Sequence, residues 1–135
     1  MVTIKEIVDA IADRLRTLGG LTVYVEPPGT VATPAMILSL GGIDYDTSMS
    51  RGSDDVRITG DLMVTAGPQG VETLYSYLDG QGANSLKALF EEDPTLGAIV
   101  HDCALSSVGR ADRADMAQAE YFHIELEWAV MAVLG

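Results

Sequence analysis

The stretch AEYFHIELEWAVMAVLG, residues 119–135, decides the fold. Its apolar side chains recur at every second position: Phe122, Ile124, Leu126, Trp128 and Val130. Because successive side chains of a strand point to opposite faces, all five share one face of a strand. Tyr121, His123, Glu125 and Glu127 make the other face polar, and from Ala129 onward both faces are apolar. We predict a strand of about twice the usual length at the centre of a sheet, covered on both sides near its end.

Length and composition favour a single structural domain over residues 1–135. The chain is 47% apolar, which is enough for a hydrophobic core. No apolar run reaches the roughly 18 residues of a membrane span, so we expect no membrane partner. The start of the chain has helical periodicity with acidic residues and does not resemble a secretory signal. The single cysteine, Cys103, cannot form an internal disulfide, which suits a reducing cytoplasm or a chain indifferent to redox state.

Acidic residues dominate the charge: 20 Asp and Glu stand against 8 Lys and Arg, giving a net charge of −12. Proteins that hold nucleic acid need a basic face, so tight binding of DNA or RNA is not expected. Repulsion of nucleic acid and simple solubility both remain open as explanations.

The first half of the chain predicts one helix and three strands. Thr3 and Glu6 form a capping box for a helix with apolar residues from Ile4 to Leu18, which Gly19-Gly20 ends. Short strands are expected at 21–25 and 35–40, and a clearly alternating strand at 56–65. The glycine-, serine- and acid-rich segment Gly41–Asp55 between them is long for a hairpin, which is typical of functional loops.

The second half predicts two helices and two strands. One helix begins at Pro68 and ends at Gly80, and its apolar stripe is Val71, Leu74, Tyr75 and Leu78. A short helix capped by Asn84 or Ser85 must stop before Pro94. A strand at 102–108 and a polar hairpin tip, Gly109–Gln118, lead into the final strand. Connections between neighbouring strands look too short for parallel crossovers. We therefore predict an α+β fold: a single antiparallel-rich sheet with the N-terminal helix and one or two further helices packed on it.

Three groups of side chains have the residue types needed for metal binding or catalysis. His101 and Cys103 would share a strand face, and His123 could approach them, but zinc needs further ligands, so Cys103 is predicted to be an inert buried residue. Calcium could use oxygen ligands on the loop 41–55, although the spacing is not that of an EF-hand; the candidates are Asp44, Asp46, Asp54 and Asp55. Glu125 and Glu127 share a strand face, but no companion pattern indicates a glycosidase. We predict no catalytic, cofactor or metal residues.

Three segments carry a resemblance to a known family: TIKEIVDAIADRL from Thr3, GGIDYDTSMSRGSDDVRITGDLMV from Gly41, and LDGQGANSLKALFEEDPTLGAIVHDC from Leu78. The last is similar to a segment of tail-terminator and minor tail proteins of long-tailed actinobacterial phages. Its fixed points are Gly80, Ser85, Lys87, Leu89, Asp93, Pro94 and Leu96.

The resemblance implies a non-enzymatic virion protein without a cofactor. Such a subunit forms a ring, typically a hexamer, at the head-proximal end of the tail tube after assembly in the host cytoplasm. One side of the ring meets the tube protein, and the other meets the neck or head–tail connector. DNA passes through the ring without being held tightly. Candidate interface or channel residues lie in the loop 41–55 and the tip 109–118: Asp44, Tyr45, Asp46, Arg51, Asp54, Asp55, Arg110, Asp112, Arg113 and Asp115.

Two other readings stay open at this point. The chain could be a different neck or head–tail joining protein of the same particle. It could also belong to another class, a small acidic ligand-binding domain, although it lacks a polar constellation for that role. On the ring interpretation, we expect some acids of the loop or tip to face the channel, where negative charge would keep DNA moving. The alternative is that these segments only make contacts between subunits and that their acids are solvated.

Overall fold

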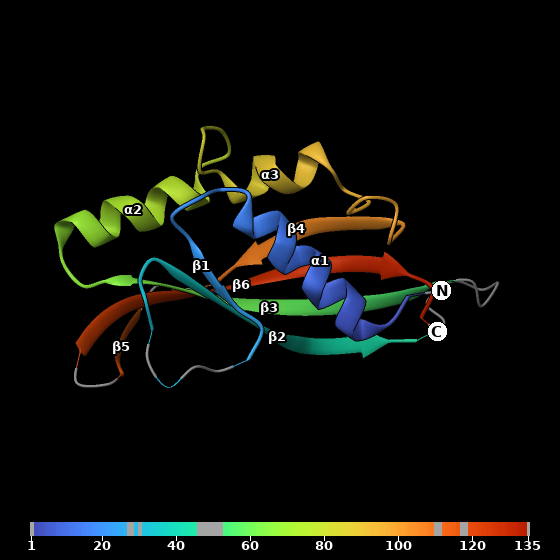
Figure 1. Ribbon diagram of the computed structural model, residues 1–135, viewed down its shortest axis with the longest axis horizontal. Helices are drawn as coiled ribbons and strands as arrows, with labels where there is room; N and C mark the ends of the chain where they lie inside the picture. The colour runs from blue at the N-terminus through green and yellow to red at the C-terminus, as the bar shows by residue number, and fades with distance from the viewer. Residues whose placement is uncertain are drawn as a thin grey trace.

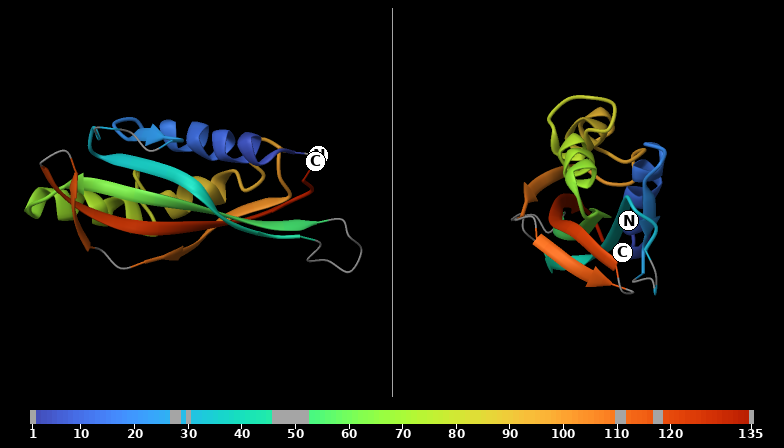
Figure 2. Two further views of the ribbon diagram at one scale, coloured as in Figure 1. Left: turned by 90° about the horizontal axis from the view of Figure 1, so that it is seen from below. Right: turned by 90° about the vertical axis from the view of Figure 1, so that its left-hand side faces the viewer.

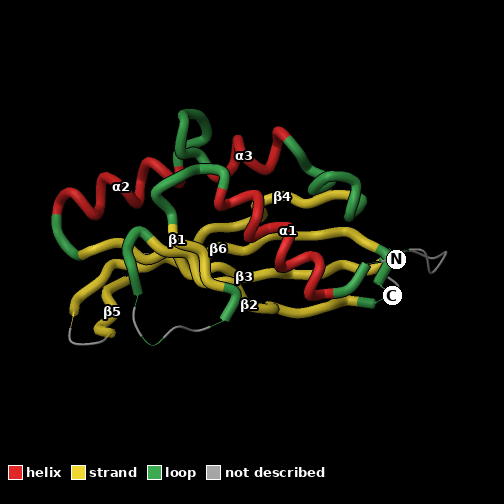
Figure 3. Tube along the Cα trace, in the orientation of Figure 1, coloured by secondary structure: helices red, strands yellow, loops and turns green. Residues whose placement is uncertain are grey.

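The protein folds into a mixed sheet with helices on one side, as a computed structural model shows (Figures 1 and 3). The structure describes residues 2–26, 29, 31–45, 53–109, 112–116 and 119–134. Along the chain its elements are α1 (Ile4–Arg16), β1 (Thr22–Tyr24), β2 (Ala35–Asp44), β3 (Asp54–Thr65), α2 (Pro68–Leu78), α3 (Leu86–Glu92), β4 (Asp102–Val108), β5 (Asp112–Met116) and β6 (Ala119–Ala132). The predicted α+β class is confirmed.

Strand β6 is an interior strand that pairs with three others, although β3 and not β6 is the middle strand of the order. The strand order is β1-β2-β3-β6-β4, and β5 also pairs with β6. One edge of β6 pairs with β3 from Tyr121 to Ala132. The other edge pairs with β4 and with β5, both antiparallel to β6.

The pairing of β1 with β2 is parallel, whereas the four other strand pairings are antiparallel. Our expectation that the connections were too short for a parallel pair was therefore wrong here. Strand β1 has only three residues, so the segment 25–34 has to cover little distance to return the chain to the start of β2.

The main core lies between the sheet and the helices. Ile7, Ile11 and Leu15 of α1 are fully buried, as are Leu126 and Trp128 of β6, which confirms the predicted core. Residues of α2, α3 and β3 belong to the same cluster: Leu74, Tyr77, Leu86, Phe90, Ile58 and Leu62. All three helices therefore pack on the same face of the sheet (Figure 2).

Gly60 makes room for the tryptophan. It faces the core from β3, and a β-carbon there would lie 2.6 Å from Cζ3 of Trp128 and 2.7 Å from Sδ of Met36. Trp128 also contacts Phe90 of α3, with 5.5 Å between the ring centroids. The missing side chain on β3 thus leaves space for the largest residue of β6 between the sheet and α3.

Three predicted burial patterns need correction. Ala129 and Met131 are exposed, so the end of β6 is covered on one face only; their apolar side chains lie on the side without helices. Tyr75 is 59% exposed and Tyr77 is buried instead, because α2 turns a different stripe toward β3 and α3. Phe122 is only partly buried, at the margin of the core.

Both predicted loops are shorter than expected. β2 continues to Asp44 past a bulge at Gly41, and β3 begins at Asp54, so the loop spans 45–53. The tip 109–118 contains β5, which pairs with β6. Backbone pairing thus extends into polar sequence, because a neighbouring strand is available to satisfy its hydrogen bonds.

Candidate functional site: an uncovered sheet face

One face of the sheet carries none of the three helices. We call it the uncovered face and define it by the outward residues of β2, β3 and β6: Ser39, Asp55, Arg57, Thr59, Asp61, His123, Glu125, Glu127, Ala129 and Met131. All ten are exposed or partly exposed. Strand alternation places them opposite the core residues of the same strands. Seven of its ten side chains are charged or carry a hydroxyl group, and this face is the candidate site.

Acidic side chains lie close together on the uncovered face. Asp61 of β3 is directly opposite Glu125 of β6, and Glu127 lies opposite Thr59. Like charges opposite each other destabilise a strand pair slightly, so packing does not explain this arrangement. His123 partly offsets it, because its Nδ1 lies 2.9 Å from Oδ1 of Asp61.

Hydroxyl groups continue the face toward its edges. The side chains of Ser39 and Thr59 hydrogen-bond across β2 and β3 at 2.7 Å. Ser106 Oγ of β4 donates to the Glu127 carbonyl oxygen at 3.0 Å. These bonds hold the strands together without covering the face, so the carboxylates of Glu125 and Glu127 stay accessible to solvent.

The uncovered face stops near the hairpin end of the sheet. Ala35, Met63 and Tyr121 are buried there, yet they do not belong to the main core. Strand alternation places all three on the side away from the helices. The accessible acidic surface therefore extends from the level of Asp61 and His123 to the opposite end.

At that opposite end, three of the four candidate calcium ligands are described, Asp44, Asp54 and Asp55, and these three do not form a common site. Oδ2 of Asp44 lies 3.3 Å from Nη1 of Arg57, and Asp55 lies opposite Asp44 on the uncovered face. Asp54 points to the helix side, where its Oδ2 accepts the Leu134 N–H at 3.2 Å. Among the described residues, no three His, Cys, Asp or Glu side chains are grouped to hold a metal ion.

The remaining candidate interface residues divide between the two ends of the sheet (Figure 1). Tyr45, beside the loop 45–53, is 67% exposed. Asp112, Arg113 and Asp115 lie on β5 near the hairpin turn, opposite residues 120–123 of β6. Asp46, Arg51 and Arg110 are outside the described residues. The two segments that we predicted as interaction elements are thus separated by the length of the sheet.

The structure does not bring His101, Cys103 and His123 together. Cys103 is buried against the core, where burial and the charge of Asp102 raise the pKa of its thiol to about 12. Such a thiol stays protonated and is a poor nucleophile or metal ligand. His101 is exposed beside Met131, whereas His123 pairs with Met63 near the other end of β6.

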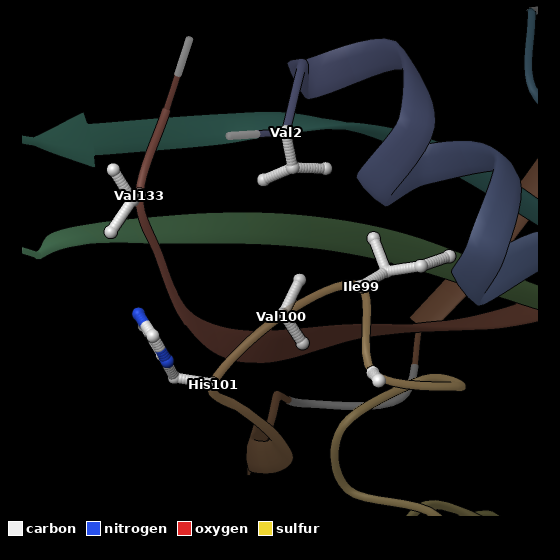
Figure 4. Close-up of a pocket in the computed structure, with 6 residues that line it drawn as sticks. Val2, Ile99, Val100, His101 and Val133 are labelled. Atoms are coloured by element: carbon white, nitrogen blue, oxygen red, sulfur yellow. The ribbon is translucent and has the colours of Figure 1, made fainter.

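A hollow of about 320 Å³ lies at the end that holds both termini (Figure 4). Val2, Ile99, Val100 and Val133 line it, and His101 stands at its side. Leu96 and Ala98, in the turn before it, have positive φ angles of 51° and 69°. Sequence reasoning missed this hollow, because the segment 95–100 lacks helix or strand periodicity and its partners lie at the chain ends.

Comparison with known proteins adds no family. The sequence matches no protein-family model, and none of the curated proteins matches it. No helix of the described structure has the length and apolar character needed to cross a membrane.

Proposed function

We propose that this chain is a virion structural protein, the tail terminator of a long-tailed phage. Copies would form a ring, six in the resembled family, at the head-proximal end of the tail tube. The ring would stop tube polymerisation and join the tail to the neck. The observation that carries this proposal is the uncovered, acid-rich sheet face, which adds to the sequence resemblance.

The shape of the subunit suits a ring wall. A terminator needs two different ends, because one end must bind the tube and the other must not bind a further ring of tube protein. Here one end of the sheet carries the hairpin turn after β5, and the other carries the loop 45–53, both termini and the apolar hollow. Two different partners could therefore bind opposite ends of one subunit.

The uncovered face would line the channel, with the helices outward. DNA carries one negative charge per roughly 1.7 Å of duplex axis, so a basic wall would hold it by many phosphate contacts. Asp55, Asp61, Glu125 and Glu127 would instead repel the passing duplex, and repetition around the ring would multiply their effect. This refines the sequence-based expectation, which placed the channel acids in the loop or the tip. Asp44 and Asp55 fit both versions, whereas Asp54 faces the helix side.

Particles assembled without this chain test the function. A missing terminator should give tail tubes of uncontrolled length that are not attached to heads. Detached tails of normal length would indicate a neck protein instead. Normal, head-attached tails would contradict a structural role at this junction. A purified chain that stays monomeric and carries a small molecule would favour the ligand-binding class.

Charge reversal tests the channel wall. The double substitution Glu125→Lys, Glu127→Lys should permit assembly and slow DNA release, most strongly at low salt, where screening is weakest. The matched control is Glu72→Lys, Asp79→Lys, which makes the same charge change at exposed positions of α2 and its C-cap. Equal rates of DNA release for the two variants and the parent would show that the uncovered face does not line the channel.

A further inference from the structure

Two strand edges of the sheet have free hydrogen-bonding groups at the same level. β1 pairs with β2 only at Ala35, Met36 and Ile37. From Leu38 to Asp44, the outer edge of β2 therefore has no strand partner within the described residues. On the other side, β4 is the last strand of the order β1-β2-β3-β6-β4. Exposed edges of this kind are templates for pairing with another chain.

Pairing registers place these two edges opposite each other across the sheet. Leu40 pairs with Ile58, Ile58 with Trp128, and Trp128 with Leu105. These residues form one row that begins on the free edge of β2 and ends on the free edge of β4. The antiparallel steps from β2 through β3 and β6 to β4 give the two edge strands opposite directions. A second copy, rotated about an axis along the strands, would thus bring its β4 antiparallel to β2.

Side chains on the helix side of this row are complementary. Leu40 is on the same face as the core residue Ile58 but is 49% exposed, because the sheet ends beside it. Next to β4 there is a hollow of about 230 Å³ between this strand and α3. Its lining is apolar at Phe90, Pro94, Cys103, Ala104 and Leu105, and the charged Lys87, Glu91 and Asp102 complete it. One edge thus projects an unburied leucine, and the other offers a recess with an apolar base and charged residues around it, on the same side of the sheet.

We propose that β2 of one copy adds to β4 of the next, with Leu40 seated in the recess between α3 and β4. This inference rests on the proposed ring and names the surfaces that close it. The contact is heterologous, so each copy uses both edges, and a rotation that closes gives a ring. Every uncovered face would then lie on the same side of one continuous sheet.

Two features of the edges limit the register. Asp44 on β2 and Asp102 on β4 are the two ends of the row Asp44–Asp55–Met131–Asp102. If each row of one copy continued directly into the same row of the next copy, Asp44 would lie opposite Asp102 of its neighbour, and the two negative charges would repel. Strands of a closed barrel are staggered. If β2 of one copy is shifted by two residues along β4 of the next, Asp44 lies beyond the first residue of that β4. Leu40 then lies opposite Cys103, which also lines the recess. The bulges at Gly41 and Ser106 bend both edges and are compatible with such curvature.

The first test places a charge in the recess. Leu40→Asp should abolish ring formation by the purified full chain, measured by light scattering, while circular dichroism remains that of the parent. The matched control is Tyr75→Asp, because Tyr75 is another exposed large apolar side chain but lies on α2, away from both edges. Rings that survive Leu40→Asp, or are lost equally in both variants, would overturn the edge pairing.

Cross-linking gives a second test that does not depend on weakening the ring. Ser39 and Ser107 are exposed and belong to one row, Ser39–Thr59–Glu127–Ser107. A stagger of two residues would displace Ser39 of one copy from Ser107 of the next by about 7 Å along the strands, which a short bismaleimide spans. In a Cys103→Ala background, the double variant Ser39→Cys, Ser107→Cys should give a covalent ladder up to the full ring with a short bismaleimide. Each single variant should give dimers at most. Rings that yield no ladder, or a parent chain that stays monomeric, would overturn the proposal.

These outcomes separate the pairing from the function. If the protein gives the covalent ladder but does not limit tube length, the edge pairing is supported and the terminator function is contradicted. If its rings limit tube length but give no ladder, the terminator function is supported and the edge pairing is contradicted.

Discussion

The two faces of the sheet are built from the same strands, but one is apolar and buried under the helices and the other is polar and exposed to solvent. On the helix side, the row Leu40–Ile58–Trp128–Leu105 is apolar from one edge to the other, and its two central residues are fully buried. On the uncovered side, the adjacent row Ser39–Thr59–Glu127–Ser107 is polar and accessible to solvent. Stability is thus concentrated on one face, which leaves the other free to carry charge.

The largest difference between the faces should appear at neighbouring residues of β6. Trp128→Ala should lower the free energy of unfolding by about 3–5 kcal/mol, because it removes a buried aromatic residue that packs on Phe90 and Gly60. Chemical denaturation monitored by circular dichroism measures this loss. A change below about 1 kcal/mol, a typical cost for an arbitrary substitution, would show that Trp128 is not central to the core.

Filling the space beneath the tryptophan should cost less. Gly60→Ala should destabilise by about 1–3 kcal/mol, because the new β-carbon would force Trp128 and Met36 to move. Gly80→Ala is the control, since a β-carbon at Gly80 would meet no atom within 4 Å. Equal unfolding free energies for the two variants would mean that the core can accommodate an added methyl group at Gly60.

Cys103, on the helix side of the sheet, should make the stability of the protein depend on pH. The folded-state pKa of Cys103 is about 12, above its ordinary value of 9.0. The folded protein therefore keeps a proton that the unfolded chain releases. This contribution to stability is complete below pH 9 and is lost as the pH rises toward 12. Cys103→Ala should consequently lose less stability than the parent between about pH 8 and pH 11. Parallel unfolding curves of the two proteins over this range would contradict the raised pKa.

Neutralising the uncovered face should have the smallest effect on stability. Glu125→Gln, with or without Glu127→Gln, should change the unfolding free energy by at most about 0.5 kcal/mol. The single change should be slightly favourable, because Glu125 lies opposite Asp61. A loss of more than about 1 kcal/mol would mean that these carboxylates are structural, outside the usual range for surface positions.

Local sequence signals predicted much of the fold. Alternation located β3 and β6, and the capping box of Thr3 and Glu6 is present at α1. Ser85 caps α3, as one of two candidates, and its Oγ accepts the Ala88 N–H at 3.2 Å. These features depend on neighbours in the sequence, so they can be read without knowing the tertiary structure.

Features set by distant partners were missed or misplaced. The parallel pairing of β1, the strand β5 within a polar tip, and the exposed Tyr75 all depend on which element lies alongside. The uncovered face was visible only in part: Glu125 and Glu127 were recognised on one strand face. Their proximity to Asp61 required the register of β3 against β6.

The direction in which the sheet faces in the assembled ring can be seen in a reconstruction of the head–tail junction of the particle, at a resolution that separates helices from strands. We predict a ring of this chain with Asp61, Glu125 and Glu127 toward the channel and the three helices outward. Helices lining the channel, with the acidic sheet face turned away from the DNA, would contradict this prediction.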